Sequence, residues 1–575
     1  MNARNARNAT STSGSGVPSG LAIRPMAAAL LVAALPAHAF QASPPNAGTI
    51  LQQQEPVRPR APQPNRPNLQ VAPDRASGLP ASRPFAVRSI RIVGNTAFST
   101  ATLHGLVASV EGGSATLAQL EALAATITGW YRDHDFPLSR AIVPAQTIAD
   151  GEVTIQVVEA HAGAVRLNNS SRVREGLLAA TLAPMRPGQA IAGATLDRAL
   201  LLLSDVPGVA VEAVIEPGAD VGAADIDVSA SVSPTTFASI VLDNAGNRYI
   251  GRTRMGVSGA ITNPLHSGDV LDANLVSTGN GMDYGRVAYE ALINGLGTRA
   301  GMGYSRVHYT LQADADALDA YGTAGVASAW IKQPVVRSRA ANLAAQLAYD
   351  SKRLRDRIGV TDTRTDRRLG NWVLSLTGDV RDGLLGGGVN AWSIGWTRGH
   401  SRFEDAAAAQ FDAATARTRG AFSKWNVNGS RLQRLGARTS MYLNVGGQWA
   451  NANLDSAEKM TVGGPYTVRA YDIGAVSGDT GYIASLELRH DVGQFAGGGV
   501  QASAFVDSAR VTINHTAWTR GENAARLSGA GLGLAWSGSN AWRANVSVAR
   551  PIGAEPALVG RQSSVRGWAT VSKAF

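Results

Sequence analysis

The C-terminal region, residues 235–575, has no helical periodicity and consists of short segments in which apolar residues alternate with small or polar ones. Segments of this kind lie at 238–242, 270–276, 443–447, 486–489, 532–536 and 544–548. Turn signals such as Asn263-Pro264 and Ser267-Gly268-Asp269 separate them. Such alternation is typical of β-strands with two different faces, so the region predicts an all-β fold.

Two all-β architectures fit this pattern, a soluble sandwich or propeller and a closed transmembrane barrel. After residue 39 no apolar run approaches the ~18 residues of a spanning helix, so a barrel is the remaining way to cross a membrane. The length without internal repeats, and the small or polar residues opposite the apolar face, favour the barrel. At about 10 residues per strand plus a turn, the region holds roughly sixteen strands. Residues 568–575 form the predicted closing strand, with Phe575 as a terminal aromatic barrel signal.

Residues 1–39 have the composition of a secretory signal peptide. Residues 1–54 contain no Asp or Glu, and an unbroken apolar core covers residues 26–35. Residues 37–39 form an A-x-A cleavage site, so we expect cleavage between Ala39 and Phe40. The alternative is a short membrane anchor, but this core is too short to span about 30 Å of hydrocarbon as a helix.

Residues 40–84 divide into a short segment and a linker. Residues 40–55 form the segment, in which 49–55 can make two helical turns and are a candidate plug helix. Residues 56–84 contain eight prolines, from Pro56 to Pro84. Proline lacks a backbone N–H, so the linker predicts a stiff, extended spacer without regular structure.

Two small α/β units are predicted between the linker and the all-β region, at residues 85–161 and 162–231. The first has predicted strands at 85–93, 139–148 and 153–157, and helices at 100–110 and 117–131. The second has predicted strands at 164–167, 209–216 and 223–233, and helices at 171–181 and 196–204. Two copies of one unit indicate a tandem array, followed by the barrel at 232–575.

Composition excludes several classes of function. The chain has no cysteine, which removes thiolate nucleophiles, disulfides and thiolate metal sites. Its nine histidines lack metal-ligand spacing, so we expect no metal and no cofactor, and no residue pattern indicates an enzyme. The net charge of +10 raises nucleic acid as a partner. The arginines are spread along the chain without a basic helix, and an exported protein does not meet nucleic acid, so this partner is not expected.

The order of several short motifs resembles a known family. The first unit contains IRIVGNT at 90–96, VPAQ at 143–146, DG at 150–151 and VVE at 157–159. The all-β region contains LDNAGNRYIG at 242–251, NPL at 263–265, GD at 268–269, VRAY at 468–471 and FVD at 505–507. Together they resemble the two-partner secretion transporters (TpsB), with two POTRA domains and a transmembrane barrel. Two positions depart from the family pattern, because Ala470 and Ala509 replace signature glycines.

The resemblance implies a site at the loop that contains Val468, Arg469, Ala470 and Tyr471. In the family this loop folds back into the barrel, and its arginine pairs with an acidic residue of the wall, which corresponds here to Asp507 beside Phe505. Guanidinium and carboxylate groups can pair bidentately and fix a loop tip. The alternative is an unpaired surface arginine.

The resemblance also implies that the POTRA domains capture a partner. Small sheets accept an extended polypeptide by strand addition at an open edge. The candidate edges are 139–148 and 209–216, with Arg140, Ile142, Gln146, Val211 and Val214 as candidate binding residues. The alternative is that both units are only a rigid periplasmic base.

The implied function is secretion across the bacterial outer membrane, with the POTRA domains in the periplasm. The implied partners are a large β-helical exoprotein of the haemolysin or adhesin type in unfolded form, outer-membrane lipid, and the barrel-assembly machinery. No ATP is expected to be used. The alternatives are an insertase of the same superfamily, a passive solute porin, and a surface adhesin. An adhesin would need long extracellular loops, for which 356–368 and 401–421 are the candidates.

Overall fold

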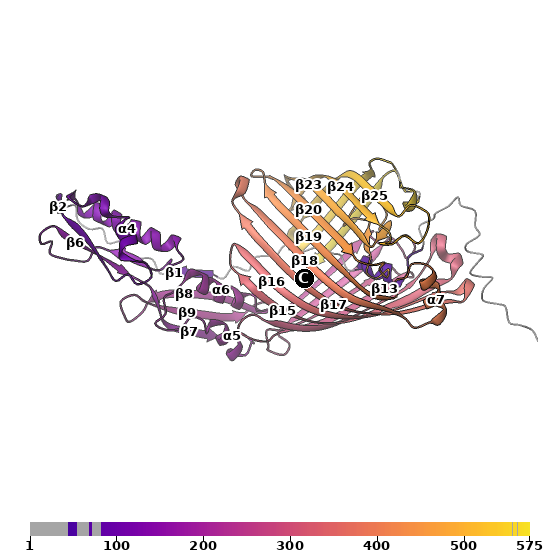
Figure 1. Ribbon diagram of the computed structural model, residues 1–575, viewed down its shortest axis with the longest axis horizontal. Helices are drawn as coiled ribbons and strands as arrows, with labels where there is room; N and C mark the ends of the chain where they lie inside the picture. The colour runs from indigo at the N-terminus through magenta and orange to yellow at the C-terminus, as the bar shows by residue number, and fades with distance from the viewer. Residues whose placement is uncertain (1–43, 55–67, 72–81, 555, 561) are drawn as a thin grey trace, which may run out of the picture. The chain divides into compact units, whose positions relative to one another are not determined.

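The computed structural model describes residues 44–54, 68–71, 82–554, 556–560 and 562–575. The expected cleavage site at Ala39 and Phe40 lies outside the described residues. Within them, sixteen strands join in chain order into a closed barrel, which confirms the predicted fold class (Figure 1). The barrel strands are β10 Thr236–Asp243, β11 Arg254–Thr262, β12 Val270–Ser277, β13 Met282–Leu292, β14 Arg299–Thr310, β15 Ala320–Arg337, β16 Ala341–Ile358, β17 Thr363–Asp382, β18 Gly388–Phe403, β19 Gly420–Arg434, β20 Thr439–Ala450, β23 Thr480–Phe495, β24 Gly498–Thr512, β25 Ala524–Ser537, β26 Trp542–Pro551 and β27 Arg566–Ala574.

All barrel strands pair antiparallel, and the ring closes between β10 and β27. The closing register runs from Ser239 opposite Ala574 to Asp243 opposite Thr570. The backbone N–H of Phe575 also donates to the carbonyl oxygen of Ala238. Phe575 therefore takes part in closing the barrel.

Alternation along each strand places apolar side chains outside the barrel and polar ones inside. On β17, Trp372 and Leu374 are 55% and 49% exposed, whereas Asn371 is 1% exposed. Large apolar side chains on the outer face are what a barrel in lipid requires, because that face contacts hydrocarbon. The inner face can carry charged groups, and these groups build the site described below.

The first α/β unit has its own apolar core. Its sheet has the order β3-β6-β5, with β3 Ser89–Val93, β6 Glu152–Val158 and β5 Arg140–Ile142. The remaining elements are β2 Phe85–Val87, α3 Thr100–His104, the 3-10 helix η1 Ala108–Val110, β4 Gly113–Ala115 and α4 Leu117–Asp133. Helix α4 begins with a capping box between Thr116 and Gln119. Its buried face packs Leu120 and Ile127 against Ile155 of β6.

The strand predicted over 139–148 is wrong beyond Ile142. Pro144 has no N–H to donate to a sheet. The side chain of Gln146 instead accepts from the Thr154 N–H at 2.7 Å and donates to the Thr154 carbonyl at 2.8 Å. A side chain thus makes the hydrogen bonds that a continued strand would have made with β6.

The second α/β unit contains a strand that comes from the linker. Its elements are β7 His161–Asn169, α5 Glu175–Leu182, α6 Gly193–Ser204, β8 Val209–Pro217 and β9 Ala223–Val232. The sheet order is β1-β8-β9-β7, where β1 is Asn68–Val71. The expectation that the linker excludes regular structure is therefore wrong at 68–71. Pro67 and Pro73 flank a proline-free window, so the intervening N–H groups are available to a strand.

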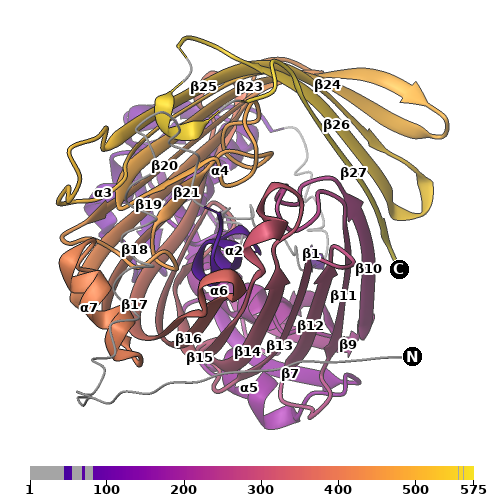
Figure 2. The ribbon, with the colours of Figure 1, turned by 90° about the vertical axis from the view of Figure 1, so that its right-hand side faces the viewer.

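Two segments lie inside the ring of barrel strands. One is helix α2, Ala47–Gln54, visible within the ring in Figure 2. The other is the loop between β20 and β23, residues 451–479, which carries the short pair β21 Met460–Val462 and β22 Val476–Gly478. None of the described helices has the length and apolar character needed to cross a bilayer.

The connections between barrel strands differ in part from the long loops that the adhesin alternative would need. Residues 356–368 are mostly strand, because β16 continues to Ile358 and β17 begins at Thr363. Helix α7, Ala406–Ala414, lies within the other candidate, 401–421. The remaining short elements are η2 Ala313–Leu318, η3 Gly359–Thr361, η4 Leu384–Gly386, η5 Ser539–Ala541 and η6 Ala557–Val559.

Candidate functional site

The 451–479 loop folds into the barrel and is buried along most of its length. Two glycines, Gly463 and Gly464, lie at its turn with φ of +101° and +102°. A residue with a Cβ is strained at such angles, so both positions require glycine. A Cβ at Gly463 would lie 2.3 Å from the Asp472 carbonyl oxygen. The sharp turn brings the chain back on itself and points the loop tip at the wall.

The tip residue Arg469 contacts Asp507 on β24 through three hydrogen bonds. Arg469 Nε donates to Asp507 Oδ2 at 2.9 Å, and Nη2 donates to Oδ1 at 2.8 Å, in a bidentate arrangement. The Arg469 backbone N–H also donates to Oδ2 at 3.1 Å. The Asp507 side chain is fully buried and that of Arg469 is 13% exposed. A buried bidentate pair fixes both the position and the direction of the loop tip.

Further contacts surround the guanidinium group of Arg469. Its Nη1 lies 2.8 Å from Glu487 Oε2 on β23, and its Cζ lies 3.2 Å from the centroid of the Phe505 ring. The carbonyl oxygen of Arg469 accepts a hydrogen bond from Trp568 Nε1 on β27. Three barrel strands therefore hold this one residue. The flanking Val468, Ala470 and Tyr471 are buried in one apolar cluster with Phe505.

A second group of charges ties the start of the loop to the opposite part of the wall. Arg367 on β17 pairs with Asp455 of the loop at 2.7 Å and with Asp356 on β16 at 2.5 Å. Glu458 of the loop pairs with Lys352 at 2.8 Å and Lys424 at 2.9 Å. Sequence reasoning missed this cluster, here called the β16–β19 charge cluster, which consists of Asp356, Arg367, Asp455, Lys352, Lys424 and Glu458. The sequence signal that could have found this cluster is the set of charged residues at inward positions of strands whose apolar and polar residues alternate.

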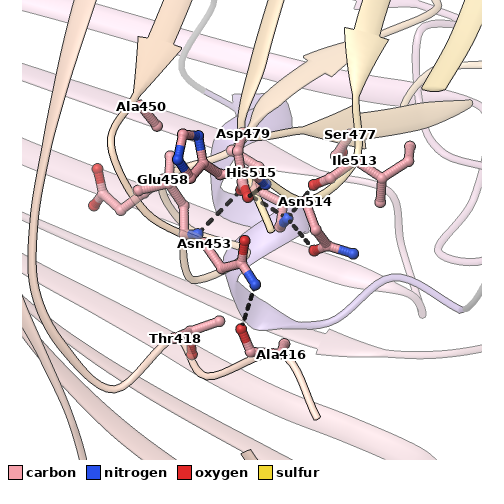
Figure 3. Close-up of polar contacts among 12 residues, drawn as sticks. Ala416, Thr418, Ala450, Asn453, Glu458, Ser477, Asp479, Ile513, Asn514 and His515 are labelled. Carbon is pink, nitrogen blue, oxygen red and sulfur yellow. Dashed lines mark hydrogen bonds and ion pairs between the residues drawn. The ribbon is translucent and has the colours of Figure 1, made fainter. Parts of the chain in front are cut away.

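A third set of contacts, drawn in Figure 3, joins both ends of the loop to the β24–β25 connection. Asp479 accepts from the Leu454 N–H at 3.0 Å and from the His515 N–H at 2.8 Å. Asn453 donates to the Thr516 carbonyl and accepts from the Thr516 N–H. Lys459 pairs with Asp479 at 2.7 Å. The loop is thus fixed at its base as well as at its tip.

Helix α2 also lies inside the barrel. Its buried Ile50 and Leu51 pack among inward residues that include Tyr309. The N–H of Ala47 donates to Asp356 Oδ1 at 2.8 Å, which links the helix to the β16–β19 charge cluster. A Cβ at Gly48 would lie 2.4 Å from Ser456 Oγ of the loop, so the helix and loop backbones are in close approach.

The candidate partner-binding residues fall in different settings. Arg140 and Ile142 lie on β5, the edge of the β3-β6-β5 sheet, and both are exposed. Gln146 bonds to Thr154, as described above. Val211 and Val214 lie on β8, which has β9 on one side and β1 on the other. Only the β5 edge of the two predicted edges is without a paired strand among the described residues.

The second unit meets the barrel at a cavity. The cavity has a volume of about 890 Å³, and Leu201 and Leu202 of α6 and Trp392 of β18 contribute to its lining. Asp205, which follows α6, pairs at its margin with Arg337 of β15 at 2.6 Å. The cavity's lining residues come from the second unit and from barrel strands β12 to β18. No cluster that could hold a metal occurs among the described residues.

Comparisons with known proteins agree with this architecture. Residues 222–536 match the family described as haemolysin secretion/activation protein ShlB/FhaC/HecB, and residues 85–160 match the POTRA domain of ShlB type. The heme/hemopexin transporter protein HuxB of Haemophilus influenzae is 25% identical over 475 residues, covering 81% of this chain and 84% of that protein. The outer membrane transporter CdiB of Dickeya dadantii is 22% identical over 458 residues, covering 78% and 80%. The solved structure of CdiB from Escherichia coli is similar in fold, with a TM-score of 0.67 and 19% identity, covering 88% of this chain and 93% of that one.

Proposed function

Because the chain belongs to the haemolysin secretion/activation protein family ShlB/FhaC/HecB, we propose that its α/β units capture an unfolded exoprotein and pass it into the barrel. Its function is that of a two-partner secretion pore of the bacterial outer membrane, with the POTRA region in the periplasm. Relatives in the family are transporters, and we assign no enzyme activity to this chain.

The observation that carries the proposal is a closed barrel whose interior holds helix α2 and an anchored loop. Helix α2 and the 451–479 loop occupy the interior between them, which suits a pore that must stay closed at rest. A barrel of about sixteen strands would otherwise leave an aqueous channel. The cavity beside α6 is lined by residues of both the second unit and the barrel, which supports passage of a partner from one to the other.

The partner we propose is a large β-helical exoprotein of the haemolysin or adhesin type. The names of the relatives include a heme/hemopexin transporter, and the family description refers to haemolysin secretion. We propose that the partner crosses unfolded, since folding outside the cell can supply the driving force without ATP. The barrel itself is proposed to reach the membrane through the barrel-assembly machinery.

Deleting residues 85–231 tests the proposal. We expect the barrel to insert, because its closing pairing involves no residue of the deleted region. Insertion is measured by heat-modifiable migration on gels, and secretion by the amount of exoprotein in the medium when its gene is co-expressed. We expect no secreted exoprotein. Normal exoprotein levels with the deleted protein would overturn capture by the α/β units.

The same strains separate secretion from insertion of other membrane proteins. An insertase would be needed for the assembly of other barrels, so its loss would deplete the outer membrane. We expect the abundance of other outer-membrane proteins to be unchanged when this chain is absent. A general depletion would favour the insertase instead.

A further inference from the structure

Strands β14 to β18 carry a row of arginines on the lipid-facing side of the barrel, here called the outer arginine row. Its members face one another across neighbouring strands. The register pairs run Arg306–Gly325, Gly325–Arg353, Arg353–Arg368 and Arg368–Arg402. All four arginine side chains are exposed, and along each strand they alternate with buried or half-buried residues. Because side chains alternate between the two faces of a strand, all four point outward.

The row lies near the strand ends opposite to those that contact the second α/β unit. Arg337, the last residue of β15, pairs with Asp205 of the second unit, and β16 begins nearby at Ala341. Arg353 lies toward the other end of β16, which ends at Ile358. Because the POTRA region is periplasmic, these other strand ends point to the cell exterior and lie in the outer leaflet of the membrane.

Outward aromatic side chains lie next to the row, nearer the middle of the membrane. Tyr304 lies two positions from the row's arginine on β14, and Tyr349 and Trp372 lie four positions from its arginines on β16 and β17. They are 53%, 40% and 55% exposed. At about 3.3 Å per residue, the row is therefore about 7–13 Å farther out along the strands. Such aromatic residues mark the membrane interface in β-barrels, so the row lies at the level of the outer lipid headgroups.

Protein groups neutralise only part of the outer arginine row. The carboxylates beside it are already bound, Glu404 by Arg368 and Asp366 by Arg357. The row's other three arginines make no side-chain hydrogen bond or ion pair with any described residue. Like charges that lie directly opposite each other on neighbouring strands are destabilising. The row therefore offers unused donors to an anion, which would also relieve the repulsion between the arginines.

Other outward arginines are arranged differently. At the periplasmic end of the same wall, Arg431 of β19 donates to both carboxylate oxygens of Asp382 on β17, at 2.7 and 2.9 Å. At the outer end, Arg510 of β24 and Arg526 of β25 also face each other, but this pair covers two strands only. The long uncompensated run of cations is thus a property of the outer end of β14 to β18.

Two tyrosine hydroxyl groups lie beside the row. A Cβ at Gly325, the β15 position within the row, would lie 3.0 Å from the Tyr304 hydroxyl oxygen. A Cβ at Gly370 on β17 would lie 2.9 Å from the Tyr349 hydroxyl oxygen. Both glycines leave room for a phenol ring to cross the neighbouring strand toward the arginines. The hydroxyl groups add hydrogen-bond donors to those of the guanidinium groups.

We propose that the outer arginine row binds the phosphate groups of lipid A, the phosphorylated glycolipid that anchors lipopolysaccharide in the outer leaflet. A guanidinium group donates two parallel hydrogen bonds to a phosphate, which a neutral headgroup does not accept as well. At about 4.8 Å between strands, the row extends about 19 Å along the wall and has space for more than one phosphate. The acyl chains lie against the apolar outer face of the barrel. Bound phosphate thereby stabilises the wall whose inner side carries the β16–β19 charge cluster.

Binding of defined lipids to the purified full-length protein tests the proposal. The probes are bisphosphorylated lipid A, the same lipid without its phosphates, phosphatidylglycerol and inorganic phosphate, each titrated in detergent and counted by native mass spectrometry. We expect lipid A to bind about tenfold more tightly than each of the other three. Equal binding of the dephosphorylated lipid would overturn phosphate recognition. Equal binding of phosphatidylglycerol or of inorganic phosphate would show a general anion site and overturn the assignment to lipid A.

A triple variant with a matched control locates the site. The variant removes the three unpaired arginines of the row, and we expect its affinity for lipid A to fall about tenfold. Its substitutions are Arg306→Ala, Arg353→Ala and Arg402→Ala. The control removes three exposed arginines near the periplasmic strand ends and should bind lipid A as the unsubstituted protein does. Its substitutions are Arg434→Ala, Arg438→Ala and Arg543→Ala. Tyr304→Phe with Tyr349→Phe removes only the two hydroxyl groups and should weaken binding about threefold.

Heat-modifiable migration on gels verifies that each variant has assembled. A measurement on the unsubstituted protein decides the matter if the triple variant does not assemble. Lipid A should raise the temperature at which compact migration is lost, because a ligand that binds only the folded barrel stabilises it, and the dephosphorylated lipid should not. Equal affinity of the triple variant and the control, or equal stabilisation by the two lipids, would overturn the proposal. None of these measurements depends on export of a partner.

Discussion

Three strands hold Arg469: β23 and β24 contact its guanidinium group, β27 contacts its carbonyl oxygen, and its main partner Asp507 is fully buried. We expect Arg469→Ala and Asp507→Ala each to reduce secretion strongly while the barrel still assembles. Removing one partner of a buried pair costs about 3–5 kcal/mol, because the other charge is left uncompensated. The double variant should be little worse than either single one, as measured by exoprotein in the medium. Fully additive losses across this cycle would contradict a shared role in holding the loop.

Arg367 and its neighbour Arg368 offer a matched comparison at the base of the loop. Arg367 is 7% exposed and pairs with Asp356 and Asp455, whereas Arg368 is 54% exposed and pairs with Glu404. We expect Arg367→Ala to lower the temperature at which the barrel loses its compact migration on gels, because the fully buried Asp455 and the 13% exposed Asp356 lose a cationic partner. Arg368→Ala should change this temperature little, since exposed pairs contribute about 0–1 kcal/mol. Equal shifts of this temperature in the two variants would show that burial of the ion pair does not determine its contribution to barrel stability.

In the first α/β unit, Glu159 joins separate elements through its carboxylate. Burial by itself would raise the pKa of Glu159, but hydrogen bonds from Thr96, Tyr131 and Ala97 lower it below its ordinary value. A carboxylate with a lowered folded pKa stabilises the fold above its unfolded pKa of about 4.3, and this contribution is lost as the pH falls through the folded pKa.

We therefore expect the free energy of unfolding of a fragment of residues 82–160 to fall below pH of about 4.3, and Glu159→Gln to weaken this pH dependence. At neutral pH the substitution should cost about 1.5–3 kcal/mol, the range for hydrogen bonds to a charged group. Urea unfolding at several pH values measures both effects. Glu152→Gln is the control, because its carboxylate is half exposed and lies 3.6 Å from Arg91. An unchanged pH profile in Glu159→Gln would contradict the assignment.

The contacts of a functional residue could be predicted from the sequence only where the residue lies in a recognisable local motif. The contact between Arg469 and Asp507 followed from two short motifs and their resemblance to a family. Asp356 and Arg367 lie in no motif, and their region was considered only as a candidate loop of the adhesin alternative. Their meeting with Asp455 depends on strand register and on the path of the loop inside the barrel, which alternation in one strand does not determine.

Strand β25 and the loop tip fit together through a small residue on each side. A Cβ at Gly529 would lie 2.4 Å from the Cβ of Ala470 and 3.1 Å from the Arg550 carbonyl oxygen. The resemblance places Ala470 at a signature glycine of the family, and Gly529 provides the space that the Ala470 methyl group needs. We expect Gly529→Ala to disturb the loop tip and reduce secretion, since overpacking costs about 1–3 kcal/mol.

Ala470→Gly should restore secretion when it is combined with Gly529→Ala, because it removes the opposing methyl group. The measurement is exoprotein in the medium at equal amounts of assembled barrel. Equal loss in the single and the combined variants would place the effect in the strand rather than at the loop tip.

Most strands and helices were predictable, and the exceptions have local causes. The barrel strands follow from alternation, and α4 follows from its apolar spacing. Strand β1 was missed because eight prolines dominate the linker, although the window between Pro67 and Pro73 contains none. Strand β5 was predicted too long, because Gln146 bonds to the neighbouring strand through its side chain.

The filled interior of the barrel predicts a low resting conductance. In planar bilayers we expect brief, low-conductance openings from the intact protein. Deleting residues 40–84 removes α2 and should raise the open fraction modestly, whereas deleting 463–474 should raise conductance much more, because the loop tip spans from β23 to β27. A stable, porin-like conductance in the intact protein would favour the solute channel.

The pairing of β10 with β27 also determines when, relative to synthesis of the chain, the barrel can close. The first barrel strand cannot complete its edge until the ribosome has made residues 570–575, since β10 pairs with β27 and Ala238 bonds to Phe575. Contacts between such distant residues form slowly, so closure is expected late. Until then each newly made chain has two unsatisfied strand edges, which invite pairing with other chains. A chain lacking residues 566–575 would keep those edges permanently. Loss of strand β27 should therefore lead to degradation of the protein before it can transport a partner.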